Sequence, residues 1–126
     1  MDVEKKIEII TRNTEEILVK EDLQKLLENG EKLKHYIGFE ISGKPHLGHG
    51  LVCMSKVKDF VDAGIEVSIF LADWHSWIND KLGGNIEVIQ RIGVPFFKEA
   101  LIAGYKCVGG NVKDLKGLPI PGVSVF

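Results

Sequence analysis

Apolar side chains recur at helical spacing in the first part of the chain. In residues 3–12 they lie three and four positions apart, which predicts an amphipathic helix. A second helix is expected from Glu21 to about Glu28, where Gly30 can adopt the left-handed conformation that ends a helix. These two segments predict a helical N-terminal extension over residues 1–33, and packing is its simplest role.

The pattern then changes to that of a strand, a helix and a second strand. Lys34 to Glu40 is short, mostly apolar and aromatic, which predicts a buried strand. His46 to Ala63 has helical periodicity and is followed by Gly64. Ile65 to Ala72 is almost continuously apolar, as expected of a strand in a parallel sheet covered on both faces. We therefore predict an α/β fold with a Rossmann-like parallel sheet over residues 34–108.

Proline and glycine interrupt the pattern after the second strand. A third helix is expected to break or kink at Pro95, because proline lacks a backbone donor and disfavours helix at the preceding residue. Phe96 to Ala103 resumes the helix, Gly104 is expected to end it, and Tyr105 to Val108 could form a third strand. Residues 109–126 are rich in glycine and proline without a periodic pattern, so we expect an irregular tail there.

Composition describes an ordinary globular domain. The chain has 126 residues, of which 44% are hydrophobic and 27% charged. The longest apolar run, Val67 to Ala72, is far shorter than the ~20 residues of a membrane-spanning helix, and the charged N-terminus lacks a signal-peptide core. We therefore expect a cytoplasmic protein without a membrane partner. Its two cysteines, Cys53 and Cys107, predict neither a disulfide framework nor a metal site.

Charge bears on binding to nucleic acids. The formal net charge is −2, with sixteen basic residues interleaved among eighteen acidic ones. Proteins that bind nucleic acids usually carry a basic face, since neutralising phosphates supplies much of their affinity. The sequence predicts no such face, so strong contacts with a nucleic acid are expected outside this chain.

A turn and two histidines follow the first strand. Ser42-Gly43-Lys44-Pro45 has turn chemistry, and His46 and His49 stand where the next helix begins. The first turn of a helix carries unpaired N–H groups and the positive end of the helix dipole, so it favours anions. Imidazoles add further donors. This arrangement predicts a phosphate-binding site, although a histidine near a helix start can also simply cap it or pack against it.

The same residues resemble a known signature. His46-Leu47-Gly48-His49, preceded by Gly38-Phe39-Glu40 and the Ser-Gly-Lys turn, resembles the motif of class I aminoacyl-tRNA synthetases, most closely the tyrosyl enzymes of archaeal and eukaryotic type. The resemblance extends from about Ile7 to about Leu101 and includes Phe70-Leu71-Ala72-Asp73-Trp74-His75. One residue departs from the motif, because Ile41 stands where the family usually has proline.

The resemblance implies a reaction and its substrates. The carboxylate of tyrosine attacks the α-phosphate of ATP, which carries Mg²⁺, and tyrosyl-adenylate then passes its tyrosyl group to tRNA. His46 and His49 are implied as catalytic residues that stabilise charge on the phosphates. The implied ATP-binding residues are Gly38, Ser42, Gly43, Lys44, His46, Gly48 and His49. No metal ligand from the protein is implied, and family members are commonly homodimers.

A second group of residues is implied for the amino acid. Tyr36 matches the position that hydrogen-bonds the substrate phenol, although a tyrosine in a core with a backbone partner is the simpler interpretation. Glu40 is implied to line the same pocket, together with Phe70, Ala72 and His75 from the second strand and its exit.

Several alternatives stay open at this point. A family member would continue into a second half-sheet, a lysine-rich loop and an anticodon-binding part, so we expect a single truncated catalytic domain, residues 1–126, with weak or no activity alone. Tryptophanyl-tRNA synthetases share the architecture, and nucleotidyltransferases also use a His-x-Gly-His motif. A nucleotide-binding fragment without catalysis is the third alternative. The sequence does not decide oligomeric state, the origin of the tail or the tRNA contacts.

Overall fold

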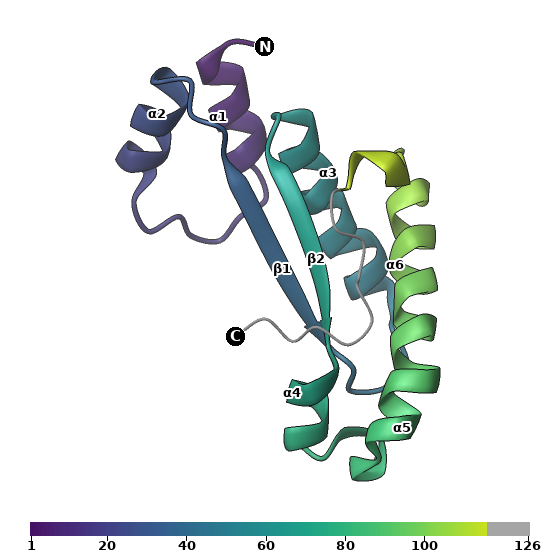
Figure 1. The fold of residues 1–126 in the computed structure, drawn as a ribbon. Helices are drawn as coiled ribbons and strands as arrows, with labels where there is room; N and C mark the ends of the chain where they lie inside the picture. The colour runs from purple at the N-terminus through teal and green to yellow at the C-terminus, as the bar shows by residue number, and fades with distance from the viewer. Residues whose placement is uncertain (116–126) are drawn as a thin grey trace.

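The computed structural model describes residues 1–115 as helices joined to one parallel pair of strands (Figure 1). The α-helices and strands in chain order are α1 (Val3–Thr11), α2 (Lys20–Glu28), β1 (Lys34–Glu40), α3 (Met54–Asp62), β2 (Glu66–Ala72), α4 (Asp73–Ile78), α5 (Ile86–Val88) and α6 (Val94–Cys107). Shorter helical turns are η1 (Gly48–Cys53), η2 (Lys81–Gly84), η3 (Ile89–Gly93) and η4 (Val112–Asp114), of which η1 and η3 are π-helical.

The two strands run parallel and in register from Lys34 opposite Glu66 to Glu40 opposite Ala72. Figure 1 shows α3 and α6 along one side of the strands, α1 and α2 at their amino ends, and α4 and α5 at their carboxyl ends. This arrangement confirms the predicted strand–helix–strand unit. It places the loop after β1 and the start of α4 at the same end of the sheet.

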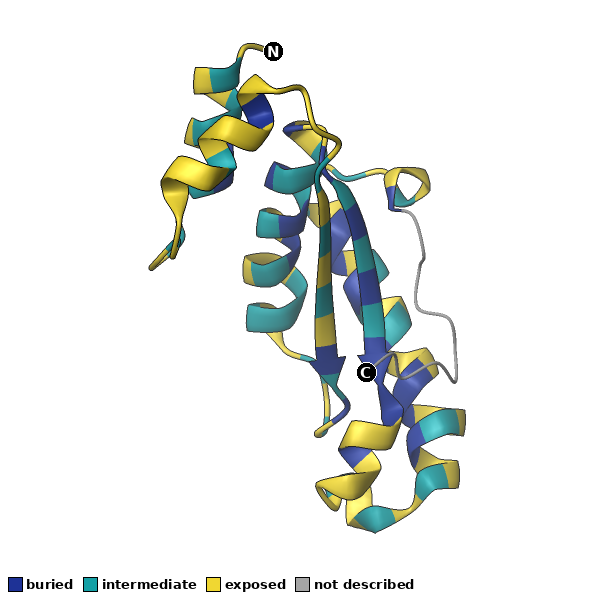
Figure 2. Ribbon diagram, turned by 60° about the vertical axis from the view of Figure 1, so that its left-hand side comes forward, coloured by how far each residue is buried: buried dark blue, intermediate teal, exposed yellow. Residues whose placement is uncertain are grey.

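The strands bury one face and leave the other accessible. In β2, Val67, Ile69 and Leu71 are at most 3% exposed, whereas Ser68 and Phe70 between them are only half-buried (Figure 2). The alternation continues in β1, where Phe39 is buried and Tyr36 is 73% exposed. The prediction of a sheet covered on both faces is therefore wrong for the described residues. The strand pattern is that of side chains pointing alternately to a covered and an accessible face.

The accessible side is called the open face below. It is formed by the even-numbered positions of the two strands, which are Lys34, Tyr36, Gly38, Glu40, Glu66, Ser68, Phe70 and Ala72; of these, Ala72 at the end of β2 is itself buried. The opposite side, packed against α3 and α6, is called the covered face. Its buried side chains include Phe39, Val57, Val67, Ile69, Leu71, Phe97 and Leu101.

Pro95 does not break the helix, so the break that the sequence predicted as one of two outcomes, a break or a kink, is wrong. Gly93 and Val94 both keep right-handed helical dihedral angles, and Pro95 lies in the first turn of α6. The preceding turn, η3, is wide: the N–H of Val94 bonds to the carbonyl of Ile89, five residues back. A π-helical turn redistributes the hydrogen bonds around the position where proline cannot donate, so the helix continues through it.

Gly104 also lies inside a helix instead of ending one. Helix α6 continues to Cys107, so the predicted strand from Tyr105 to Val108 is wrong. Gly104 is buried, and a Cβ atom there would collide with the backbone of Gly50 in η1. Glycine therefore serves here as the contact point of two crossing helices.

The tail was predicted to be irregular over residues 109–126. Its described part, to residue 115, contains the short helical turn η4, in which the side chain of Asn111 accepts a hydrogen bond from the N–H of Lys113. The rest of the tail lies outside the described residues.

The N-terminal extension is held to α3 by charged groups. The guanidinium of Arg12 donates two hydrogen bonds to the carboxylate of Asp59, which is only 7% exposed. Lys56 donates to the carbonyl oxygens of Ile9 and Arg12 at 3.2 and 2.7 Å, where α1 ends. These contacts tie the extension to the helix that follows the histidine motif. Within residues 1–115, no helix is both long and apolar enough to cross a membrane.

Candidate functional site

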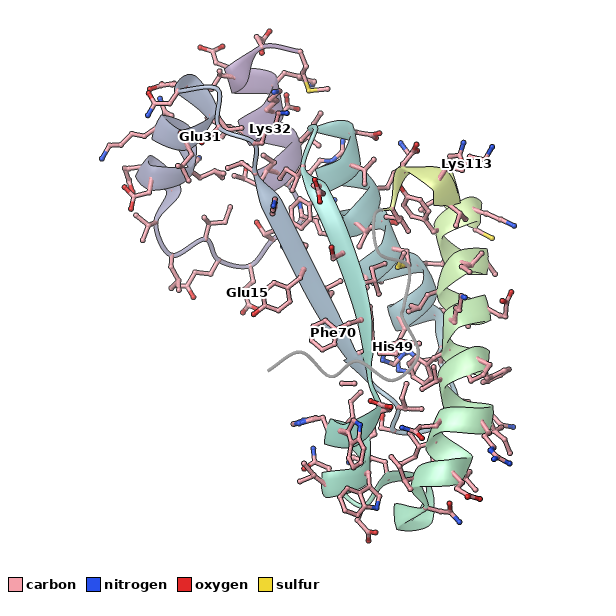
Figure 3. The ribbon with its side chains drawn as sticks, in the orientation of Figure 1. Glu15, Glu31, Lys32, His49, Phe70 and Lys113 are labelled. Carbon is pink, nitrogen blue, oxygen red and sulfur yellow. The ribbon has the colours of Figure 1, made fainter. Side chains whose placement is uncertain are left out.

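The two histidines of the motif lie against each other at the carboxyl ends of the strands. Their ring centroids are 4.1 Å apart. His46 is exposed, whereas His49 is half-buried between the rings of Phe39 and Phe97, at centroid distances of 5.9 and 5.6 Å. Figure 3 shows His49 near the carboxyl ends of the strands, on the side of α6. One imidazole is therefore fixed by packing, and the other faces solvent.

Hydrogen bonds to the ring nitrogens determine what these imidazoles can donate. The Nδ1 atom of His46 accepts the N–H of Gly48 at 3.1 Å, and the Nδ1 atom of His49 accepts the N–H of His46 at 3.5 Å, a long contact. When Nδ1 accepts, a neutral imidazole carries its proton on Nε2. Both rings can therefore present an Nε2–H group to an oxygen of a bound anion.

The protonation of His49 follows from its surroundings. Burial lowers the pKa of His49 from its ordinary value of 6.5, and the neighbouring His46 lowers it further. A neutral ring is favoured because the cation would lose hydration and meet a second imidazole. At neutral pH His49 is therefore a neutral N–H donor.

Glycines bring the backbone close to this pair. A Cβ on Gly48 would lie 2.9 Å from Cε1 of His46, so a larger residue would displace the ring. Gly50 faces α6 across the helix crossing described above. The start of the helix thus holds the two imidazoles in a narrow space. The loop residues Ser42 and Lys44 are exposed beside it, and Gly43 is half-buried.

The residues predicted to contact an amino acid lie on the open face. The rings of Tyr36 and Phe70 are 5.9 Å apart, and Gly38 pairs with Phe70 in the strand register. A Cβ on Gly38 would collide with the Phe70 ring, so glycine allows that ring to lie across β1. Tyr36 is not a core residue, because nearly three quarters of it is exposed, at 73%.

Glu40 is the centre of a polar cluster at the end of the open face. Its carboxylate accepts a hydrogen bond from the amide of Asn79 at 2.7 Å, and it lies 3.8 Å from Nε2 of His75 and 3.7 Å from Nζ of Lys81. The amide of Asn79 also lies 3.0 Å from Nε2 of His75. Ala72, paired with Glu40 in the register, adds no bulk beside this cluster.

The structure thus separates the predicted residues into two neighbouring groups. His46, Gly48 and His49 lie at the helix start on the side of α6. The amino-acid group lies on the open face or at its end, where Figure 3 shows Phe70 on the side of the strands away from α6. Both groups meet at the carboxyl edge, where ligands of parallel sheets bind.

Sequence reasoning missed several residues of this edge. Asp73 is fully buried and accepts hydrogen bonds from its neighbour Trp74 and from the side chain of Gln90, each at 2.8 Å. Asn79 and Lys81 contact the carboxylate of Glu40. A polar residue directly after a buried strand was the available signal for Asp73. Nothing in the pattern connected it to Gln90, seventeen residues away.

Comparison with known proteins now places the chain in a family. The family model described as tRNA synthetases class I (W and Y) matches residues 28–91, about half of the chain. The chain belongs to the class I tRNA synthetases. All candidate residues of this synthetase site, from Tyr36 to His75, lie within the matched range.

Named relatives within the class I synthetases are tyrosine enzymes. The chain is 56% identical over 117 residues to the tyrosine–tRNA ligase of Thermococcus sibiricus, covering 92% of this chain and 31% of that protein. It superposes on the tyrosyl-tRNA synthetase of Pyrococcus horikoshii, solved with L-tyrosine, with a TM-score of 0.88 and 48% identity. It also superposes on the enzyme of Aeropyrum pernix with a TM-score of 0.80 and 40% identity.

These matches confirm the predicted family and the Rossmann-like α/β class. They also show that the chain spans about a third of the relatives' length, since it covers 32% of the Pyrococcus horikoshii chain and 34% of the Aeropyrum pernix chain.

Proposed function

We propose that this chain forms the ATP- and tyrosine-binding part of a tyrosine–tRNA ligase, and that it takes part in forming tyrosyl-adenylate. The observation that carries the proposal is the paired imidazoles, both able to donate from Nε2, beside an open face that carries Tyr36. The tyrosine–tRNA ligases among its relatives, at 50–56% identity, support the choice of amino acid.

In the proposed reaction the protein forms no covalent bond with the substrates. A carboxylate oxygen of tyrosine bonds to the α-phosphorus of ATP, the bond from that phosphorus to the bridging oxygen breaks, and pyrophosphate leaves. Negative charge grows on the departing phosphates. His46 and His49 stabilise it by donating Nε2–H hydrogen bonds, and the packed position of His49 avoids part of the cost of reorganising solvent.

The glycines and the loop are proposed to hold ATP. Gly38 is exposed in β1 and Gly48 is half-buried at the helix start, where the rings of Phe70 and His46 lie against them, and both are proposed to contact the nucleotide. Ser42, Gly43 and Lys44 would contact the phosphates from the loop between them. Mg²⁺ would arrive as part of the nucleotide substrate.

Tyrosine is proposed to bind on the open face. The hydroxyl of Tyr36 is accessible for a hydrogen bond to the substrate phenol, and the ring of Phe70 offers an apolar surface beside it. Glu40 and His75 would line the end of this pocket, and the small side chain of Ala72 leaves room for a flat ring.

The partners of the complete protein belong to the same proposal. The function would require transfer of the tyrosyl group to tRNA. A homodimeric assembly and a cytoplasmic location commonly accompany this function, and both are part of the proposal. The net charge of −2 supports tRNA contacts outside this chain. The organisation as one catalytic domain, with an extension over residues 1–33, is proposed as well.

One observation favours a second candidate, a nucleotide-binding unit without catalysis. Within the described residues, tyrosine bound at Tyr36 would be enclosed from the strand side only, because that side chain is 73% exposed. Groups that act together in catalysis lose most of their effect when some are missing. ATP binding with no adenylate formation would be the result for such a unit.

Tyrosine-dependent exchange of labelled pyrophosphate into ATP tests the proposal. We expect exchange, weak for this chain alone, with tyrosine and not with tryptophan, and its loss in His46→Ala and His49→Ala. His35→Ala is the matched control, because His35 stacks on Phe60 of the covered face at 4.6 Å and lies outside the site. ATP binding without exchange would favour the second candidate. An equal loss in the His35 variant would contradict the assigned roles.

A further inference from the structure

A buried hydroxyl joins the ends of the two strands. Ser76 in α4 and Ile41, the residue after β1, are both fully buried, at 0% exposure. The Oγ atom of Ser76 accepts the backbone N–H of Ile41 at 2.7 Å and donates to the carbonyl oxygen of Ala72 at 2.6 Å. One side chain therefore connects the backbone beyond β1 to the last residue of β2.

Ile41 is the buried residue from which loop 42–45, the proposed phosphate-binding loop, begins. Its side chain packs so closely against η3 that a Cβ on Gly93 would lie 2.6 Å from Cγ2 of Ile41. The next residue, Ser42, is exposed, as is Lys44. The backbone thus passes from an enclosed position to an exposed loop within one residue. A group that orients the backbone of Ile41 therefore also sets the direction in which the loop leaves the sheet.

The hydrogen bond to Ser76 is a requirement of burial. A buried N–H group without a partner is strongly unfavourable, so nearly all such groups in folded proteins are paired. A proline at this position would have no N–H to pair and would fix its own φ angle. With isoleucine there, the chain has an extra donor and a freer backbone, and Ser76 supplies the acceptor for that donor.

We propose that Ser76 is a positioning residue for loop 42–45. By holding Ile41 against Ala72, it fixes the start of the loop relative to the histidine pair. The expected effect on nucleotide binding rests on the function proposed above, whereas the expected effect on the order of the loop does not rest on it.

Hydrogen exchange without nucleotide tests the proposal in the complete chain. Ser76→Ala should increase exchange at the amides of Ile41 to Lys44 by roughly tenfold or more, since the donor of Ile41 loses its buried partner. Amides in the middle of β2, such as Ile69, should change much less. Ser68→Ala, a half-buried serine on the open face, is the matched control and should leave the loop unchanged.

A double variant separates positioning from general stability. In an Ile41→Pro background no N–H remains to be paired, so adding Ser76→Ala should change loop exchange by less than about twofold. If Ile41→Pro does not fold, the comparison of Ser76→Ala with Ser68→Ala carries the test alone. A uniform rise in exchange across the strands, or no rise in the loop, would overturn the proposal.

ATP titration then links the loop to binding. If the chain binds ATP, Ser76→Ala should weaken binding at least threefold, while Ser55→Ala, an exposed serine of α3 outside the proposed site, leaves it unchanged. Equal ATP affinity in Ser76→Ala and the unaltered chain, despite faster loop exchange, would contradict the effect on binding. A chain that does not bind ATP would contradict the proposed function, whereas the exchange result would still decide the role of Ser76.

Discussion

The two faces of the same pair of strands are built for different purposes. On the covered face, Phe97 is 1% exposed and Val67 is 0% exposed, packed between the strands and two helices. On the open face, Tyr36 is 73% exposed only one residue from half-buried Ile37. Alternation along a strand thus places residues that stabilise the fold beside residues that are free to bind.

Substitutions on the two faces should therefore have different effects on stability and on binding. Burial of apolar surface on the covered face supplies most of the folding free energy, so changes there should affect stability first. Residues on the open face have little to lose on unfolding, so changes there should affect binding first.

The largest effect is expected for Phe97→Ala. Removing a fully buried aromatic ring leaves a cavity and should lower the free energy of unfolding by about 3–5 kcal/mol. Urea unfolding followed by far-UV circular dichroism measures it, and Phe97→Leu serves if the alanine variant does not fold. Tyr36→Ala on the open face is the control, with an expected change of about 0.5 kcal/mol or less. Similar losses for both variants would contradict the separation of the faces.

A smaller effect is expected where η1 and α6 cross. Gly104→Ala should destabilise the protein by about 1–3 kcal/mol, because the new methyl group would collide with the backbone of Gly50. In Gly50→Ala, the nearest atom of Gly104 would be 3.9 Å away, an ordinary contact. The melting temperatures of Gly104→Ala and Gly50→Ala, measured by thermal unfolding, compare the two sides of this helix crossing. Equal melting temperatures for the two variants would show that the close contact at Gly104 does not restrict the size of its side chain.

The smallest effect is expected from pH. Burial lowers the pKa of His35 and of His49 below 6.5, so the folded chain binds fewer protons than the unfolded chain just below that pH. The stability from these two histidines is therefore complete above pH 6.5 and decreases as pH falls through and below it. Melting temperatures between pH 8 and 5 measure this decrease, which His35→Gln/His49→Gln should reduce. An unchanged pH dependence in the double variant would contradict it.

The sequence predicted local structure well where the local signal was strong. The strand from Lys34 to Glu40 was predicted with its observed bounds, and Gly64 ends the helical segment with a left-handed φ of 85°. The histidine motif was found because its residues are consecutive. All these features depend on backbone preferences and neighbouring side chains.

Features that depend on distant contacts were decided by the tertiary structure. Gly104 was predicted to end a helix, but it is the point where α6 meets Gly50, more than fifty residues earlier in the chain. The exposure of Tyr36 depends on which face α3 and α6 cover, and the pairing of Ser76 with Ile41 spans thirty-five residues. The local sequence thus sufficed for the two parallel strands, the end of the helix at Gly64 and the chemistry of the motif. Only packing decided which glycine permits a crossing, which face stays open and which hydroxyl holds the loop, because each of these depends on atoms that the fold alone brings together.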